Sequence, residues 1–289
     1  MSPSAPGSPD EVRTALDAAG YLVDDGLATA IFLALSLGQP LLLEGEPGVG
    51  KTEAAKALAR WLEVPLFRLQ CYEGISASEA LYEWNYQRQL LALRVGEARH
   101  EQVAEDDLFA ERFLEERPIL RAVRHTGETV PVLLIDEIDR ADDEFEAMLF
   151  EFLGEQSVTV PELGTFSAVR PPVVVLTSNR SRELHDALRR RCLYHWIDFP
   201  SPERAVEIAR RAVPSATEPV VVAATGLVAR ARELELEKAP GMAEAIDLAA
   251  ALTALGVTSP SPSDLSRTLG AVAKTAEDRA LLAETVAAS

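Results

Sequence analysis

Five short stretches of the chain are apolar in the manner of buried strands. Residues 41–43, 132–135 and 173–177 are continuous apolar runs, and residues 64–71 alternate between apolar and polar positions. A fifth run covers residues 193–199. Continuous apolar runs are typical of strands that are covered on both faces, so the pattern predicts a parallel sheet.

Amphipathic stretches between these runs predict helices. Apolar residues at helical spacing cover residues 10–37, with a break near Gly20, and an alanine-rich helix is predicted over residues 51–62. Residues 144–153 place the side chains of Phe145 and Phe152 on one helical face. Strands that alternate with helices predict an α/β fold, in which a five-stranded parallel sheet lies between helices.

Two segments interrupt this alternation. Residues 74–99 are polar and aromatic, with the sequence YEWNY at 82–86, and are predicted to be helical in their second half. Residues 157–160 and 165–169 are joined by 161–164, which predicts a β-hairpin over about residues 157–169.

The chain changes character near Pro200. Beyond it the sequence is alanine-rich and helical, so we predict an α/β core over residues 10–200 and a small all-helical domain over residues 201–289. Residues 1–9 read MSPSAPGSP, a composition that predicts a disordered N-terminal lead.

The charge balance narrows the possible partners. The chain has 46 acidic and 28 basic residues, a formal net charge of -18. Such a surface repels phosphate backbones, so we expect no nucleic-acid partner. The most apolar stretch, residues 27–37, is about half the roughly 20 residues that span a bilayer, and residues 1–9 lack the features of a signal peptide. We therefore expect a cytoplasmic protein without membrane insertion.

A glycine-rich segment follows the first predicted strand and precedes a predicted helix. Its residues fit the phosphate-binding pattern GxxxxGK[ST], and they are Gly45, Glu46, Pro47, Gly48, Val49, Gly50, Lys51 and Thr52. Glycines let backbone N–H groups approach phosphate oxygens, and the following helix adds its positive dipole end. Lys51 is predicted to reach the β- and γ-phosphates, and Thr52 to ligate Mg²⁺. The segment thus predicts that the cofactors are ATP and Mg²⁺.

Two adjacent carboxylates end the strand predicted at residues 132–135. Side chains at neighbouring strand positions point in opposite directions, so Asp136 can hold the Mg²⁺ shell while Glu137 orients or deprotonates the attacking water. Asp139 is interpreted as part of a solvated turn, together with the acidic residues 142–144 that follow. For Arg140 a nucleotide contact across an interface and a structural ion pair stay open.

Two further polar groups follow predicted elements. Asn179 comes directly after the strand at 173–177, where its amide could donate to the γ-phosphate or to the lytic water. Arg189, Arg190 and Arg191 exceed what capping of a helix needs, so we expect at least one to act on the developing phosphoryl charge. Cys71 and Cys192 have no CxxC spacing and are predicted to be reduced thiols.

In this order the motifs resemble those of AAA+ ATPases, and most closely those of the MoxR group with its CoxD-like branch. The resemblance rests on GEPGVGKT at 45–52, QCYEG at 70–74, YEWNY at 82–86, LLIDEIDRAD at 133–142, TSNR at 177–180 and ALRRRCLYHWIDFPSPE at 187–203. It implies a P-loop NTPase core followed by a helical lid, with residues 74–99 as an insertion in the second helix.

The resemblance also implies an assembly and a task. Arg191 occupies the place of the arginine finger that enters the neighbouring subunit's site, with Arg190 as the second candidate, so a ring oligomer, most simply a hexamer, is expected. The implied activity is that of an ATP-hydrolysing chaperone for metalloenzyme maturation. Its client would be a molybdenum hydroxylase of the carbon monoxide dehydrogenase type, and its partner a protein with a von Willebrand factor A domain.

One departure from the family pattern concerns the lid. MoxR-group proteins carry a sensor arginine early in the lid, often as Pro-Arg, whereas residues 238–244 of this chain read KAPGMAE. The sequence therefore identifies no lid sensor: Lys238 or another group could take its place, or the coupling between lid and nucleotide could be weak.

Three other function classes fit the sequence less well. A GTPase would need an NKxD sequence, which the chain lacks, and a small-molecule kinase would need an acceptor site and lid arginines. A DNA motor or loader would need a basic strip, whereas residues 74–99 mix arginines with glutamates. A scaffold that only binds ATP would not need the intact pair of Asp136 and Glu137. The ATPase chaperone is therefore the leading hypothesis.

Overall fold

The computed structural model of the chain describes residues 6–100 and 104–287. The chain forms two compact units. The first comprises Met1–Ala19, Val23–Glu44 and Ala55–His195, and the second comprises Gly20–Leu22, Gly45–Ala54 and Trp196–Ser289. Residues 1–5 of the expected disordered lead lie outside the described ranges, and the predicted domain limits stay predictions.

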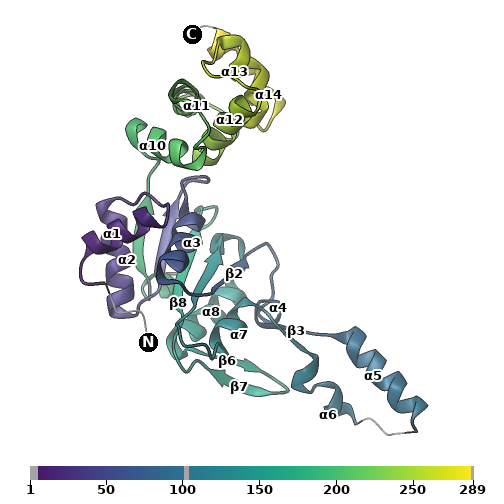
Figure 1. The fold of residues 1–289 in the computed structure, drawn as a ribbon. Helices are drawn as coiled ribbons and strands as arrows, with labels where there is room; N and C mark the ends of the chain where they lie inside the picture. The colour runs from purple at the N-terminus through teal and green to yellow at the C-terminus, as the bar shows by residue number, and fades with distance from the viewer. Residues whose placement is uncertain (1–5, 101–103, 288–289) are drawn as a thin grey trace. The chain divides into compact units, whose positions relative to one another are not determined.

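A five-stranded sheet forms the centre of the first unit (Figure 1). Its strand order is β2-β5-β8-β1-β9, and the pairings of β2 with β5, β5 with β8 and β8 with β1 are parallel. The strands are β1 (Leu41–Gly45), β2 (Leu66–Gln70), β5 (Val132–Asp136), β8 (Val173–Ser178) and β9 (Leu193–Ile197). All five lie where apolar runs predicted them, and the α/β fold class is confirmed.

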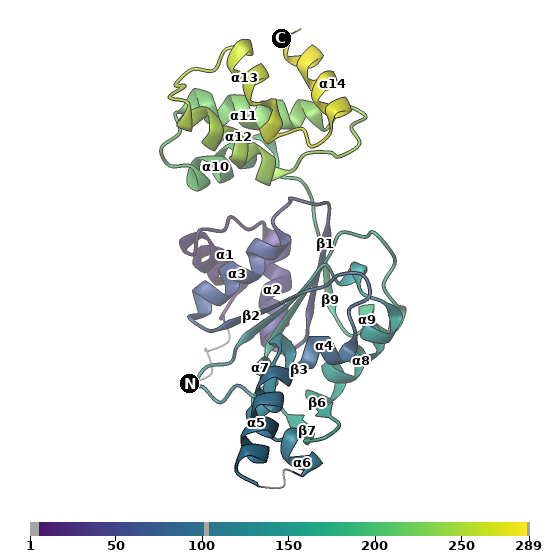
Figure 2. The same cartoon turned by 90° about the vertical axis from the view of Figure 1, so that its right-hand side faces the viewer.

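Helices cover the sheet. They are α1 (Pro9–Ala18), α2 (Asp25–Leu37), α3 (Lys51–Leu62), α7 (Pro118–Val123), α8 (Asp143–Glu155) and α9 (Asp186–Arg189). Figure 2 shows α1 and α2 on one side of β1 and α8 on the other. Alternate strand residues such as Leu133 and Ile135 pack with Phe145 of α8 in one buried cluster. The sheet is therefore buried on this face, as its apolar strands predict.

The segment at residues 74–99 contains more than the expected helix. α4 (Ala77–Leu81) leads into β3 (Tyr82–Trp84), and α5 (Tyr86–Ala98) follows as the predicted helical half. After α6 (Glu105–Leu108) and a 3₁₀ turn (Glu111–Phe113), β4 (Leu114–Glu116) pairs antiparallel with β3. The sequence pattern did not reveal this small sheet, because β4 carries two glutamates and β3 one. Its Trp84 is buried and packs edge-to-face on Phe109 at 5.3 Å between ring centroids.

A hairpin lies between α8 and β8. It consists of β6 (Ser157–Val160) and β7 (Gly164–Ser167), which pair antiparallel within the range expected for a hairpin. A 3₁₀ turn (Ile138–Arg140) connects β5 with α8. These connections place the ends of β5 and β8 next to each other on the sheet.

The second unit contains a helical bundle with its own apolar core. Its helices are α10 (Pro202–Ala212), α11 (Glu218–Ala231), α12 (Met242–Ala254), α13 (Pro262–Thr268) and α14 (Ala276–Ala287), with a 3₁₀ turn at Leu269–Ala271. Alanine, leucine and valine side chains of these helices form one buried cluster, as the alanine-rich pattern predicts. Within the described ranges, no helix has the length and apolar character that crossing a membrane requires.

Candidate nucleotide site

The glycine-rich segment joins β1 to α3 and belongs to the second unit. Gly48 and Gly50 have φ of +78° and +99°, a backbone conformation that L side chains rarely adopt. At Gly45 a Cβ atom would lie 2.4 Å from the carbonyl oxygen of Ile197, so only glycine fits there. The loop thus has the conformation by which consecutive backbone amides form an anion-binding concavity.

Lys51 is the first residue of α3, and its side chain turns back into this loop. The residue is buried, and its Nζ donates hydrogen bonds to the carbonyl oxygens of Gly45 and Glu46, each at 2.7 Å. The ammonium group is therefore held inside the loop that the sequence predicts to receive phosphates, rather than in solvent. Thr52 follows it in the first turn of α3.

The two predicted carboxylates lie at the carboxyl end of β5, in the first unit. Asp136 is the last residue of the strand and is 2% exposed. Glu137 lies beyond the strand with φ of 55° and ψ of 49°, in the left-handed region. Strand alternation, the reason for expecting the two side chains to point in opposite directions, therefore does not extend to Glu137. A left-handed turn at Glu137 sets its direction instead.

Thr177 of β8 links the two acidic residues. Its Oγ1 donates to Asp136 Oδ1 at 2.5 Å and accepts a hydrogen bond from the backbone N–H of Glu137 at 2.9 Å. Sequence reasoning placed Thr177 at a strand end without giving it a role. The parallel register, in which Ile135 pairs with Leu176, brings the two following residues together.

Arg68 of β2 approaches Asp136 from the other side. Its Nε donates to Asp136 Oδ2 at 2.9 Å, and its Nη2 lies 2.6 Å from the same oxygen. The guanidinium group thus places a positive charge directly beside the buried carboxylate. Sequence reasoning missed Arg68, whose one signal was a cationic residue inside a predicted strand.

Asp139 is buried, which corrects the expectation of a solvated turn. It is 2% exposed, and its carboxylate accepts hydrogen bonds from the backbone N–H groups of Asn179 (3.1 Å) and Ser181 (2.8 Å) and from Ser181 Oγ (2.6 Å). The loop after β8, with the half-buried Asn179, is thus attached to the turn after β5. Of the acidic residues after Asp139, Asp142 caps α8 by accepting the backbone N–H of Phe145 at 2.9 Å, as a helix start predicts.

The arginines after α9 differ in their surroundings. Arg191 donates from Nη1 to the carbonyl oxygen of Phe150 at 2.7 Å, and its guanidinium carbon lies 3.7 Å from the centroid of the Phe150 ring. Gly154 leaves room for it, since a Cβ there would lie 2.1 Å from Arg191 Nη1. Arg190 is exposed. Arg140, for which two roles stayed open, forms an ion pair with Glu137 at 3.2 Å.

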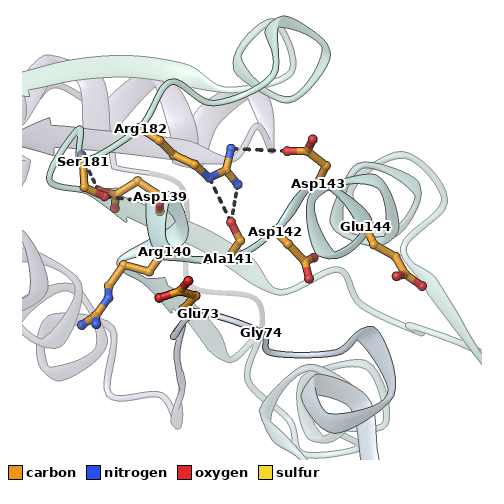
Figure 3. A pocket seen from close by; sticks show the side chains of 10 residues that line it. All are labelled: Glu73, Gly74, Asp139, Arg140, Ala141, Asp142, Asp143, Glu144, Ser181 and Arg182. Carbon is orange, nitrogen blue, oxygen red and sulfur yellow. Dashed lines mark hydrogen bonds and ion pairs between the residues drawn. The ribbon is translucent and has the colours of Figure 1, made fainter.

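An open pocket of about 670 Å³ lies beside the turn after β5 (Figure 3). Acidic side chains line much of it, among them Glu73, Asp142 and Glu144. Arg182 also lines the pocket. Its Nε donates to the carbonyl oxygen of Ala141 at 2.9 Å, and its guanidinium group forms an ion pair with the buried Glu146. These contacts hold the loop after β8 against the start of α8.

Burial raises the pKa of a thiol that lies near Asp136. Cys71 follows β2 and is a buried free cysteine. Burial, and next the negative charge of Asp136, raise the pKa of Cys71 to about 12. Burial also raises the pKa of Cys192 to about 12. Both thiols are therefore protonated in the folded chain at neutral pH, in agreement with the prediction of reduced, partly buried cysteines.

At pH 8, iodoacetamide is expected to alkylate neither thiol of the folded protein, because the thiolate is the nucleophile. The unfolded chain, with thiol pKa values of about 8.5, should react at both positions. The pKa of each thiol is higher in the folded chain than in the unfolded chain, so the protonated thiols stabilise the folded state. This contribution to the free energy of unfolding is complete below about pH 8.5 and is lost as the pH rises toward 12. Mass spectrometry of native and urea-unfolded samples checks the result, and rapid native alkylation of Cys71 would contradict it.

The sheet order and the motifs define the class of the protein. The carboxyl ends of β5, β8 and β1 lie on one edge of the sheet, and the glycine-rich loop begins where β1 ends. This is the α/β fold of a P-loop NTPase with a helical C-terminal region. Residues 40–192, more than half of the 289 residues, match the AAA domain family, dynein-related subfamily. The chain belongs to this family.

Known proteins resemble the chain at a distance. Protein NorQ of Paracoccus denitrificans is 25% identical over 205 residues, which cover 68% of this chain and 66% of NorQ. Denitrification regulatory protein NirQ of Pseudomonas aeruginosa is 23% identical over 178 residues, or 59% of each protein. The alignments thus span just under two thirds of NorQ and 59% of NirQ. Both relatives agree with the resemblance to the MoxR group.

Solved structures support the fold. A RuvB mutant of Thermotoga maritima superposes with a TM-score of 0.50 at 20% sequence identity. The match covers 92% of this chain and 73% of that one. At this level of identity the likeness concerns the fold alone.

Proposed function

We propose that the chain binds ATP with Mg²⁺ and hydrolyses it. The observation that carries this proposal is the acid pair, in which a buried Asp136 and a left-handed Glu137 are joined by Thr177. The pair lies at the carboxyl end of β5, and the glycine-rich loop follows the carboxyl end of β1 in the same sheet.

The residues fit a nucleotide and its metal. The positive φ angles of Gly48 and Gly50 form the cradle, and Lys51 supplies a cation within it. Thr52 and Asp136 offer hydroxyl and carboxylate oxygens, which are the donors Mg²⁺ prefers. When bound, the metal would polarise the phosphate oxygens. In this proposal Glu137 orients the attacking water, and Asn179 donates to it or to the terminal phosphate.

Purified wild-type protein should release phosphate from MgATP without a phosphorylated acceptor. Lys51→Met should bind ATP much more weakly, because the ammonium group that the loop holds is gone. Phosphate release and calorimetric titration with MgATP check both expectations. Absence of nucleotide binding by the wild-type protein would overturn the proposal, and an acceptor requirement would favour a kinase.

We further propose that the work done with ATP is chaperoning of a metalloenzyme. Membership of the AAA domain family and the relatives NorQ and NirQ support this reading. The finer assignment to the CoxD-like branch adds a molybdenum hydroxylase client and a von Willebrand factor A domain partner. Capture on an ATP-loaded Glu137→Gln protein, followed by mass spectrometry, should recover such proteins and not DNA. Capture of DNA alone would contradict this assignment.

We also propose a ring in which Arg190 or Arg191 completes the neighbouring site. Arg190 is exposed, whereas Arg191 is engaged by Phe150 of its own chain, so these surroundings favour Arg190. Mixing Arg190→Ala subunits with Glu137→Gln subunits should restore part of the ATPase activity. The reason is that, where the two kinds of subunit meet, the Arg190→Ala subunit provides a site with Glu137 and the Glu137→Gln subunit provides Arg190. Restoration with Arg191→Ala subunits and not with Arg190→Ala subunits would reverse the assignment.

A further inference from the structure

We infer that Arg232 is the residue of the helical region that distinguishes ATP from ADP; this inference rests on the proposed ATP binding. Arg232 caps the carboxyl end of α11, and its guanidinium group forms an ion pair with Glu46 of the glycine-rich loop. Both residues belong to the second unit. A cation from the helical bundle therefore reaches the phosphate-binding loop directly.

Two further contacts fix this side chain in place. Its Nη1 donates to the carbonyl oxygen of Pro240 at 3.0 Å, and its guanidinium carbon lies 4.3 Å from the ring centroid of Phe199. The side chain is only 18% exposed. A planar, stacked guanidinium with donors on two edges is pre-organised to bind an anion in a fixed direction.

Backbone contacts leave no room for a side chain at Gly241, the residue that precedes α12. A Cβ at Gly241 would lie 2.8 Å from the Cα of Gly48 and 2.9 Å from the carbonyl oxygen of Pro47. The N–H of Met242 donates to the carbonyl oxygen of Gly48 at 3.1 Å. The residue that precedes α12 therefore supplies no cation to this loop, whereas Arg232 at the end of α11 contacts it.

Glu46 is the partner that Arg232 would exchange. The side chain of Glu46 is 52% exposed, compared with 18% for Arg232, so Glu46 is the less confined partner of this ion pair. A triphosphate in the loop offers Arg232 more negative charge than the single carboxylate of Glu46, and a diphosphate offers less than a triphosphate. Arg232 should thus favour the binding of ATP over that of ADP. Glu46 competes with both nucleotides for the guanidinium group of Arg232.

The test is a comparison of ATP and ADP dissociation constants in the full-length protein. Arg232→Ala should lower the preference for ATP over ADP by about tenfold or more, since a hydrogen bond to a charged group is lost. Arg232→Lys should restore part of this preference, because it keeps the charge without the fork. Arg230→Ala, on the exposed face of the same helix, is the matched control and should bind as the wild type does.

A second variant separates direct recognition from loss of structure. Glu46→Gln should tighten ATP binding in the wild-type background and have no such effect in the Arg232→Ala background. An unchanged ratio of ATP to ADP affinity in Arg232→Ala, or equal effects of Glu46→Gln in both backgrounds, would overturn the inference. Failure of the wild-type protein to bind either nucleotide would instead refute the proposed function.

Discussion

Glu137→Gln is expected to lower the kcat of ATP hydrolysis by about 10²–10⁴-fold, the range for removal of a general base. ATP affinity should stay close to that of the wild type. The amide has nearly the volume of the carboxylate, and the backbone hydrogen bond from Glu137 to Thr177 does not involve the side chain. Asp136 and its contacts with Arg68 and Thr177 remain intact. The substitution removes the charge that pairs with Arg140 and the ability to take a proton from water.

Phosphate release under saturating MgATP and equilibrium titration with the same nucleotide measure the two quantities separately. Glu144→Gln serves as the control, because Glu144 is an exposed carboxylate in the first turn of α8, a few residues along the chain. It should hydrolyse ATP at the wild-type rate. Equal turnover by Glu137→Gln and wild type would remove Glu137 from the proposed mechanism.

Phe145→Ala is expected to lower the free energy of unfolding by about 3–5 kcal/mol, the usual cost of truncating a buried aromatic side chain. Phe145 is fully buried and packs in the cluster that contains Ile135 of β5 and Leu176 of β8. The cavity would therefore open directly beneath the strands that carry the acid pair and Thr177.

Urea unfolding of the full-length chain, followed by circular dichroism, checks this value. Tyr86→Ala is a suitable control, since Tyr86 is also aromatic but is 68% exposed on α5. Its effect should stay within about 0.5 kcal/mol, as for most surface substitutions. Similar losses for both variants would show that Phe145 does not anchor the core.

Local sequence signals were sufficient for the sheet and for the phosphate-binding loop. Each strand is a short apolar run, and the loop pattern depends on residues 45–52 alone. The paired strands β3 and β4 escaped detection because they are three residues each and are partly acidic. Short polar strands have no periodicity long enough to recognise.

The contacts around the acid pair could not be predicted, because they depend on register between distant strands. Thr177 and Arg68 meet Asp136 only once β2, β5 and β8 are aligned. Asp139 resembled a turn residue in the sequence, yet the loop after β8 buries it. Arg232 is even more remote from Glu46, and no spacing rule connects residues 186 positions apart.

The backbone of Glu137 carries a lasting conformational penalty. A left-handed conformation costs a side chain with a Cβ about 1–2 kcal/mol, and glycine or asparagine would adopt it more easily. Selection for a more stable fold alone would therefore drive this position away from glutamate. A natural relative that has glycine here would be the more robust molecule, and it would have become a nucleotide-binding scaffold that no longer turns over its ligand.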